Sequence, residues 1–282
     1  MPAADAVELS VEAAWFIAEE GEVGTFPWVL AITPPCCDVS ERAAFASRQV
    51  AELTRLGLVA HGRIDPAVRQ WIRVVCWPER WLELRYVDGA GSSADRLRGI
   101  VAYRQGQIVV ALRNAQLVTF TALNIASGQA MSPIVTAALP GRAAARFEEF
   151  TLPLRVGARA DEQLREGAEL SDVMRHLGIP ESARAVVRAT FDQPTTYVEV
   201  LAGQLDGATP MTTEIGIAVL DSAAGRLVVS PVRAFDGEWV SVFAPGTDLA
   251  IALAIERLTD VLPAGPWFSP LQPVRDFIAQ DS

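Results

Sequence analysis

A chain of 282 residues, half of them hydrophobic, can bury a sizeable core as one large domain or as two domains of about 140 residues each. The formal net charge of −10 opposes the phosphate backbone of nucleic acid and the surface of anionic lipids, so neither is an expected partner. No basic segment followed by an apolar one occurs in the first thirty residues, and the longest apolar run, Leu249 to Ile255, is too short to span a bilayer. With three cysteines, which suit a reducing compartment, the chain is expected to be cytoplasmic.

The first half of the chain is predicted to begin with helices and to continue with strands. Ser10, Ser40 and Asp65-Pro66 are typical starts of helices, and Gly21 and Gly57 are typical ends. Apolar spacing predicts helices at Val11 to Glu20, Ser40 to Leu56 and Asp65 to Val75, strands at Ala6 to Leu9, Phe26 to Ile32, Trp81 to Val87, Gly99 to Arg104, Ile108 to Arg113 and Gln116 to Leu123, and a short helix near Met131 to Ala138.

The stretch from Gln107 to Leu123 sets the expected architecture. Apolar residues occupy both faces of its first strand, which is typical of a strand in a sheet that is covered on both sides. Gln105-Gly106 separates this strand from the preceding one, and a two-residue connection ending in glycine predicts a hairpin. We therefore expect antiparallel pairing.

The second half is predicted to repeat this order of elements. Three strand sequences recur in the same order, which indicates an internal duplication: Trp81-Leu82-Glu83-Leu84 as Tyr197-Val198-Glu199-Val200, Gly99-Ile100-Val101-Ala102 as Gly216-Ile217-Ala218-Val219, and Ile108-Val109-Val110 as Leu227-Val228-Val229. The predicted elements are a possible strand at 147–152, helices at Ala160 to Arg165, Ser171 to Leu177, Glu181 to Phe191 and Asp248 to Leu262, strands at Tyr197 to Gln204, Thr212 to Asp221, Leu227 to Val232 and Trp239 to Ala244, and an extended tail from Pro263.

These elements predict an α+β fold made of two units, 1–155 and 156–282, that pack as one body. Pro231 is expected at an edge or a bulge because proline cannot donate a ladder hydrogen bond.

No pattern of catalytic or metal-binding residues stands out. His61 and His176 have no Cys, Asp or His at ligand spacing, and Cys36-Cys37 lacks the spacing of a zinc or redox pair. Glu83 and Glu199 occupy equivalent places in the two units and could form a carboxylate pair, although a solvated strand face explains them better. We expect no cofactor, no metal and no catalytic residue; a small-molecule-binding or hydrolytic α+β enzyme is the alternative.

Two helical pairs, Ala51 to Trp71 and Ser171 to Phe191, resemble helix-turn-helix units in outline, but the acidic charge argues against DNA binding.

Two features suggest that the chain binds another protein. The connection from Asp88 to Arg98 is longer than the matching connection from Asp206 to Met211, and long Gly- and Ser-rich connections are usually functional or disordered. On the last helix, Leu249 and Leu253 fall on the face opposite the predicted core side, so they are expected to meet solvent.

Longer stretches carry a resemblance to a known family. The segments DAVELS, FPWVLAIT, AELTRLGLV, QWIRVVC, VVALRNAQLVTFTAL, GARADEQLREGA, TYVEVLAG and AFDGEWVSVFAPG resemble the EspG family of actinobacterial type VII secretion, most closely the paralogue of the iron-related system. The resemblance covers nearly the whole chain. It implies a cytosolic chaperone without enzymatic activity and a pseudo-twofold body with helical bundles around a central antiparallel sheet.

The resemblance also implies the partner, a PE–PPE heterodimer that is held through the apolar tip of the PPE subunit and kept soluble for export. In the family, the tip docks on a loop between two strands, on the sheet and on the C-terminal helices. We expect apolar contacts to supply affinity and loop residues to choose the partner, and a possible homodimer when the protein is free. The residues that this implies as partner-binding are Asp88, Ser92, Asp95, Arg96, Arg98, Arg104, Glu199, Glu214, Ser230, Asp236, Leu249 and Leu253.

Overall fold

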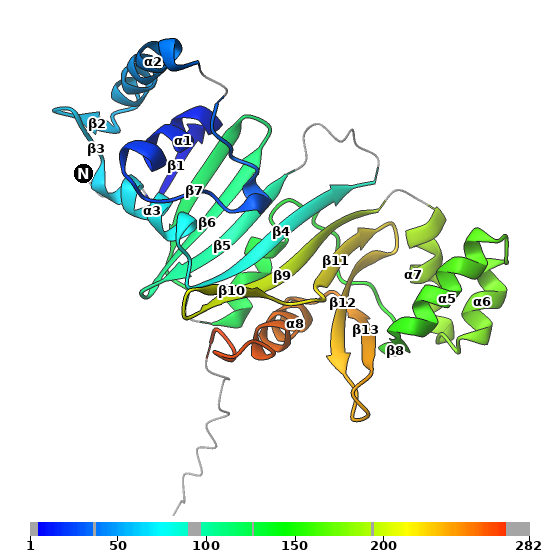
Figure 1. Cartoon of the computed structure of the whole chain (residues 1–282). Helices are drawn as coiled ribbons and strands as arrows, with labels where there is room; N and C mark the ends of the chain where they lie inside the picture. Colours follow the sequence, from blue (N-terminus) through cyan, green and yellow to red (C-terminus); the bar gives the residue numbers. More distant parts are fainter. Residues whose placement is uncertain (1–4, 36–37, 90–96, 126, 193–194, 269–282) are drawn as a thin grey trace, which may run out of the picture.

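One large antiparallel sheet runs through the molecule, with helices on both of its faces (Figure 1). The computed structural model describes residues 5–35, 38–89, 97–125, 127–192 and 195–268. Within these ranges the chain forms an eleven-stranded sheet and a separate two-stranded hairpin. The predicted α+β class with a central antiparallel sheet is confirmed.

The large sheet is built around two four-stranded meanders that meet at its centre, and three further strands pair with them. Its order is β1-β7-β6-β5-β4-β9-β11-β12-β13-β8, with β10 paired to β9 outside this path. The strands are β1 (Ala6–Ser10), β4 (Arg80–Asp88), β5 (Arg98–Arg104), β6 (Gln107–Asn114), β7 (Leu117–Leu123), β8 (Phe150–Pro153), β9 (Thr196–Asp206), β10 (Thr209–Thr212), β11 (Ile217–Ser222), β12 (Gly225–Arg233) and β13 (Trp239–Pro245), with β2 (Val59–Ala60) and β3 (Arg63–Ile64) in the hairpin.

Three helices precede each meander. The helices are α1 (Val11–Glu20), α2 (Arg42–Arg55), α3 (Pro66–Cys76), α4 (Ser132–Val135), α5 (Leu154–Arg165), α6 (Leu170–His176), α7 (Glu181–Asp192) and α8 (Asp248–Asp260), with short 3-10 helices η1 (Trp28–Leu30), η2 (Val39–Glu41) and η4 (Gly128–Met131). Capping fixes several starts: Ser10 Oγ accepts from the Ala13 N–H at 3.1 Å, and Asp65 Oδ1 accepts from the Ala67 N–H at 2.8 Å.

The two units are related by a pseudo-twofold axis through the β4–β9 pair. Each unit is a strand at a sheet end, three helices and a meander: β1, α1–α3, β4–β7 in the first, and β8, α5–α7, β9 and β11–β13 in the second. Leu84 and Val200, which correspond in the first sequence echo, lie directly opposite each other at the centre. The sheet is continuous across this pair. The division at residues 155 and 156 stays a prediction, and the pairing of β8 with β13 favours a second unit that starts before Phe150.

The other two sequence echoes are one residue out of register with the structure. Leu84 pairs with Gly99, whereas its counterpart Val200 pairs with Ile217, so Gly99 corresponds to Ile217 and not to the echoed Gly216. Because side chains alternate between faces, a shift of one residue exchanges the two faces of a strand. The duplication is present, but the register of these echoes was wrong.

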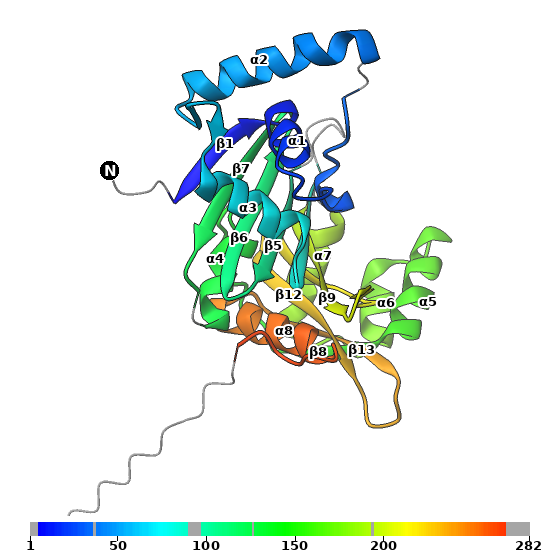
Figure 2. The same ribbon diagram turned by 60° about the vertical axis from the view of Figure 1, so that its left-hand side comes forward.

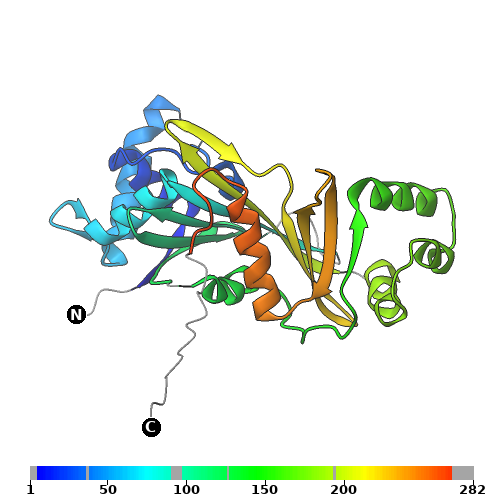
Figure 3. The same cartoon turned by 90° about the horizontal axis from the view of Figure 1, so that it is seen from below.

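The sheet separates two hydrophobic cores. On one face, α1 and α3 pack on side chains such as Val109 and Ala111; on the other, α8 and η4 pack on a set that includes Val110, Leu84 and Val200. Both faces of β6 are therefore buried, as its sequence predicts. Figure 2 shows α2 lying across the end of this assembly, beyond α1. Figure 3 shows α5, α6 and α7 at the opposite end from α1 to α3.

Several predicted elements differ in the structure. The prediction of a strand at Phe26 to Ile32 was wrong, because this segment forms the short η1 helix, which is followed by the capping residue Ala31 with a φ of 49°. The strand predicted at Thr212 to Asp221 is divided into β10 and β11. The first helix of the second unit begins earlier, at Leu154, and the predicted helix near Met131 is divided between η4 and α4. The hairpin at Gln105-Gly106 is confirmed, with φ values of 49° and 80°.

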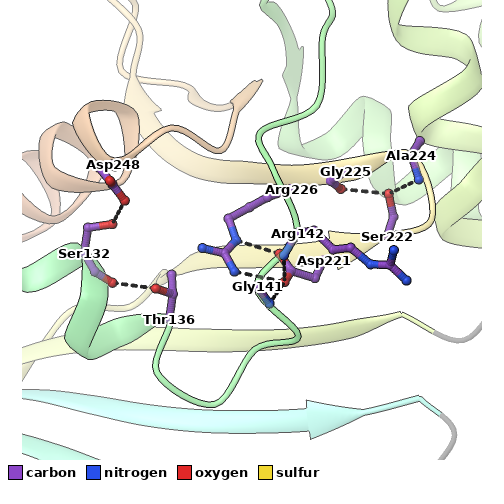
Figure 4. Close-up of polar contacts among 10 residues, drawn as sticks. All are labelled: Ser132, Thr136, Gly141, Arg142, Asp221, Ser222, Ala224, Gly225, Arg226 and Asp248. Atoms are coloured by element: carbon purple, nitrogen blue, oxygen red, sulfur yellow. Dashed lines mark hydrogen bonds and ion pairs between the residues drawn. The ribbon is translucent and has the colours of Figure 1, made fainter.

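A buried ion pair holds the segment that joins the two units (Figure 4). Asp221 in β11 and Arg226 in β12 form two parallel hydrogen bonds of 2.6 and 2.9 Å, and the Asp221 side chain is fully buried. The same carboxylate accepts hydrogen bonds from the N–H groups of Gly141 and Arg142, at 3.0 and 3.1 Å. A charge-assisted cluster of this kind fixes the connection against the second meander.

Candidate functional site

A hollow of about 380 Å³ opens beside η1, where β4 and β5 flank the long connection between them. Its walls combine an exposed aromatic ring, aliphatic groups and four charged side chains. It is lined by Trp28, Val29, Glu83, Arg85, Tyr86, Val87, Leu97, Arg98 and Glu199. The hollow lies on the sheet face that carries α1 and α3, because Glu83 and Arg85 point to the same side as Trp81.

Trp28 is 90 % exposed although its neighbours in η1 are anchored. Val29 and Leu30 are buried in the core beneath α1 and α3. The Arg113 guanidinium donates to the Leu30 carbonyl at 2.8 Å and also to the carbonyl of Ala31. These contacts hold the backbone of η1 in place and leave the Trp28 indole in solvent. A large, pre-positioned aromatic side chain of this type is typical of a binding hot spot.

Charges of both signs surround this ring. Arg85, Arg98 and Arg113 lie opposite one another across β4, β5 and β6. The pKa of Arg113 is lowered by burial and by the positive charge of Arg98. Arg85 is paired with Glu83 at 2.8 Å and faces Glu199 across the β4–β9 ladder. The charges can therefore select a partner of complementary pattern around an apolar contact.

The structure brings three of the predicted site residues to this end of the sheet. Asp88 ends β4, Arg98 begins β5, and Glu199 lies in β9 next to them. Asp88 Oδ1 accepts a 3.5 Å hydrogen bond from Thr196. Ser92, Asp95 and Arg96 lie outside the described residues. Trp28 was missed because FPWVLAI was interpreted as a strand, although Pro27 before it is a signal for an irregular turn.

Arg104 is not part of this group. It lies at the other end of β5 from Arg98, where its Nη1 donates to the Trp77 carbonyl at 2.7 Å.

A second surface lies around α8. The prediction that Leu249 and Leu253 meet solvent is confirmed, since they are 55 % and 41 % exposed while Ile251, Ile255 and Leu258 are buried. Glu214 lines a second hollow, also of about 380 Å³, between β10, β12 and the end of α8.

The remaining two predicted residues lie on or near the β12–β13 hairpin. Ser230 is only 5 % exposed, which leaves no accessible side chain for a partner in this conformation. Asp236 is exposed in the turn and accepts a hydrogen bond from the Glu238 N–H at 3.0 Å.

The second hollow opens because the sheet splits beside Pro231. The β11–β12 ladder ends at Ala218 and Val229, so Pro231 pairs only with β13. The predicted edge or bulge at Pro231 is thus a local edge, at the end of an interior strand. On the other wall β10 pairs only with β9 and contains Pro210.

The described part of the chain assembles no metal site. No group of three or more His, Cys, Asp or Glu side chains among these residues could hold a metal ion. Glu83 lies opposite Leu201 and Glu199 lies opposite Arg85, so the two carboxylates are diagonal neighbours on one face of the sheet, and Glu83 is ion-paired with Arg85. Cys76 is buried, and burial raises the pKa of its thiol to about 12, which disfavours the nucleophilic thiolate. No described helix is long and apolar enough to cross a membrane.

In fold, the chain is similar to a type VII secretion system chaperone. It superposes on Mycobacterium tuberculosis EspG5, solved in complex with the PE25-PPE41 dimer, with a TM-score of 0.78 and 16 % sequence identity over 93 % of this chain and 98 % of that chain. The family model described as the EspG family matches residues 10–257, and the chain therefore belongs to the EspG family.

Relatives of known sequence agree with this family. The ESX-3 secretion-associated protein EspG3 of Mycobacterium tuberculosis (strain CDC 1551) is 54 % identical, with 99 % of this chain and 98 % of the relative covered. EspG3 of Mycolicibacterium smegmatis is 53 % identical, over 97 % and 92 %. The ESX-1 secretion-associated protein EspG1 of Mycobacterium tuberculosis (strain H37Rv) is 28 % identical, over 93 % and 89 %. The predicted family is confirmed.

Proposed function

We propose that this chain is a cytoplasmic chaperone without catalytic activity that binds PE–PPE heterodimers and keeps them soluble for type VII secretion. The observation that carries the proposal is the likeness, over almost the whole chain, to a chaperone solved together with a PE–PPE dimer. Membership of the EspG family supports it.

Covering an apolar tip requires no chemistry. A helical protein that is exported while folded exposes apolar side chains that would otherwise self-associate. A chaperone that binds only the dispersed form raises the population of that form by mass action. We infer that the contact is made through the PPE subunit, because an apolar end of a helical bundle fits a surface that combines exposed aromatic and aliphatic side chains.

Two surfaces supply such side chains in the structure. The first is the hollow beside η1, with Trp28 at its rim and Arg98 and Glu199 in its walls. The second is the exposed face of α8 with Leu249 and Leu253. We propose that the first surface and the adjoining connection select the partner and that α8 adds apolar contact area. A free chaperone with these surfaces uncovered is expected to form homodimers through them.

Co-expression of the chain with candidate PE–PPE pairs, followed by size-exclusion chromatography, tests this function. We expect one pair to co-elute as a complex of one chaperone with one heterodimer. Trp28→Ala is expected to weaken the complex by at least tenfold, because interface tryptophans often contribute about 2 kcal/mol or more. Leu56→Ala, an exposed apolar residue at the end of α2, is the matched control and should leave the affinity unchanged. Failure of every tested pair to co-elute would contradict the function, whereas equal affinities of the two variants would contradict only the first surface.

A further inference from the structure

The two units differ in how tightly their third helix fills the space above the sheet. The residues of α3 that face the sheet follow helical spacing and are all buried: Val68, Trp71, Ile72 and Val75. The inward residues of α7 at the same spacing are smaller: Ala183, Val186, Val187 and Thr190. A smaller set of side chains on the same scaffold leaves volume unfilled.

A cavity of about 260 Å³ lies between the helices α5–α7 and the second meander, and Val187 and Thr190 of this set line it. One wall contains Phe150 and Phe243, whose rings stack at 4.7 Å between centroids with planes 2° apart. Met174 and Val187 lie on the helical side.

The chemistry of the cavity walls selects a narrow class of ligand. Thr190, whose hydroxyl hydrogen-bonds the Val187 carbonyl at 2.7 Å, has its donor satisfied within the helix. Asp161 is the single ionisable residue in the lining, and it is exposed, which places it at the mouth. Phe191, also in the lining, is 55 % exposed at the rim. The walls therefore offer no partner for a charged group, and the mouth repels an anion.

An apolar cavity of this size favours a ligand over water. Apolar cavities stay dry, and one of about 150 Å³ in another protein binds benzene. Atoms that line an empty space lose dispersion contacts, which a ligand of matching shape restores. We propose that this cavity is a binding site for a small uncharged ligand, rich in hydrocarbon, of one or two fused rings. This inference does not depend on the chaperone function.

Binding of 2-naphthol and 2-naphthoate to the full chain tests the site, because the two probes share a ring system and differ in charge at pH 7. We expect saturable binding of 2-naphthol in calorimetric titration together with a rise in the melting temperature. The affinity for 2-naphthoate should be at least tenfold lower than that for 2-naphthol. Asp161→Asn removes the negative charge at the mouth and should reduce this difference in affinity between the two probes.

A second test fills the cavity with a larger side chain of the protein itself. Val187→Phe is expected to raise the melting temperature without ligand and to weaken 2-naphthol binding by at least tenfold. Val50→Phe, on the exposed side of α2, adds the same volume elsewhere and should change neither quantity. If Val187→Phe does not fold, Ala160→Leu fills the cavity from α5 and gives the same test. The proposal is overturned if 2-naphthol does not bind saturably, or if the filled variants bind it as well as the original chain.

Discussion

At the scale of single residues, the buried Asp221 both forms an ion pair and binds backbone N–H groups. Its carboxylate neutralises Arg226 and accepts two backbone hydrogen bonds from the connection between the units. A buried charge is tolerated only when it is paired and hydrogen-bonded, so the removal of one partner costs more than the pair contributes.

Asp221→Asn should lower the free energy of unfolding by about 3 kcal/mol, because it leaves the Arg226 charge uncompensated in the interior. Urea denaturation followed by circular dichroism measures this change. Asp172→Asn is the control, since Asp172 and Arg175 form an exposed pair, and exposed pairs contribute less than about 1 kcal/mol. Equal effects of the two substitutions would show that the buried cluster contributes no more to the free energy of unfolding than the exposed pair does.

We expect the protein to lose stability at alkaline pH because of two buried groups, the Cys76 thiol and the Tyr86 hydroxyl. Burial raises the pKa of the Cys76 thiol from 9.0 to about 12 and raises the pKa of the Tyr86 hydroxyl, which donates to the Val135 carbonyl at 3.1 Å. Both groups ionise at lower pH in the unfolded chain, so the stability that they contribute is complete below pH 9 and is lost as the pH rises toward the folded pKa values. We expect Cys76 to account for about 1 kcal/mol of the stability lost between pH 8 and pH 10.

Urea denaturation at these two pH values checks the expectation. The difference between pH 8 and pH 10 should be smaller in Cys76→Ala than in the original chain. An identical difference in both proteins would mean that the thiol does not contribute to the alkaline loss.

At the scale of elements, α8 has an apolar core face and a second, partly exposed apolar face. Leu253→Arg should preserve the melting temperature, because this side chain is 41 % exposed, and should weaken a PE–PPE complex by at least tenfold if α8 contacts the partner. Calorimetric titration of a purified partner pair measures the affinity. Val50→Arg on α2, with similar exposure, is expected to bind normally. Normal binding by both variants would remove α8 from the interface.

Elements with regular apolar spacing and with capping or turn residues at their ends were predictable from the sequence, and irregular elements were not. The helix at Val11–Glu20 and the strands around Gln105-Gly106 were correct because capping residues, apolar spacing and turn residues agree there. FPWVLAI has the composition of a strand, but Arg113, far along the chain, holds its carbonyls in a short helix. A contact of that sequence separation leaves no local signal, and Trp28 was missed with it.

At the scale of the whole molecule, the duplication could be recognised from the sequence, but its register could not. Short strands of Val, Ile and Ala match each other at several alignments. The correct alignment is set by which face meets which helices, a property of the assembled sheet. The cavity beneath α7 could not be predicted from the sequence either. The inward residues of α7 are recognised as small only by comparison with the residues at the same spacing in α3.

The continuous sheet predicts cooperative unfolding of both units. The β4–β9 pair joins the meanders along nine residue pairs, so neither half can lose its strands without exposing the other. Leu84→Ala, at the centre, should lower the free energy of unfolding by about 3 kcal/mol. Urea denaturation should still show a single transition, in which fluorescence and circular dichroism change together. Two separated transitions would show that the halves unfold as independent domains.

Two prolines, Pro210 in β10 and Pro231 in β12, border the split in the sheet and limit the addition of further strands there. An opening between strands presents free backbone groups that could capture a passing extended segment, and cross-β growth begins in this way. Each proline withholds a donor from its wall, so the opening is a poor template for further strands. An extended segment of another chain should therefore add to this opening less readily than to a strand edge that keeps all its donors.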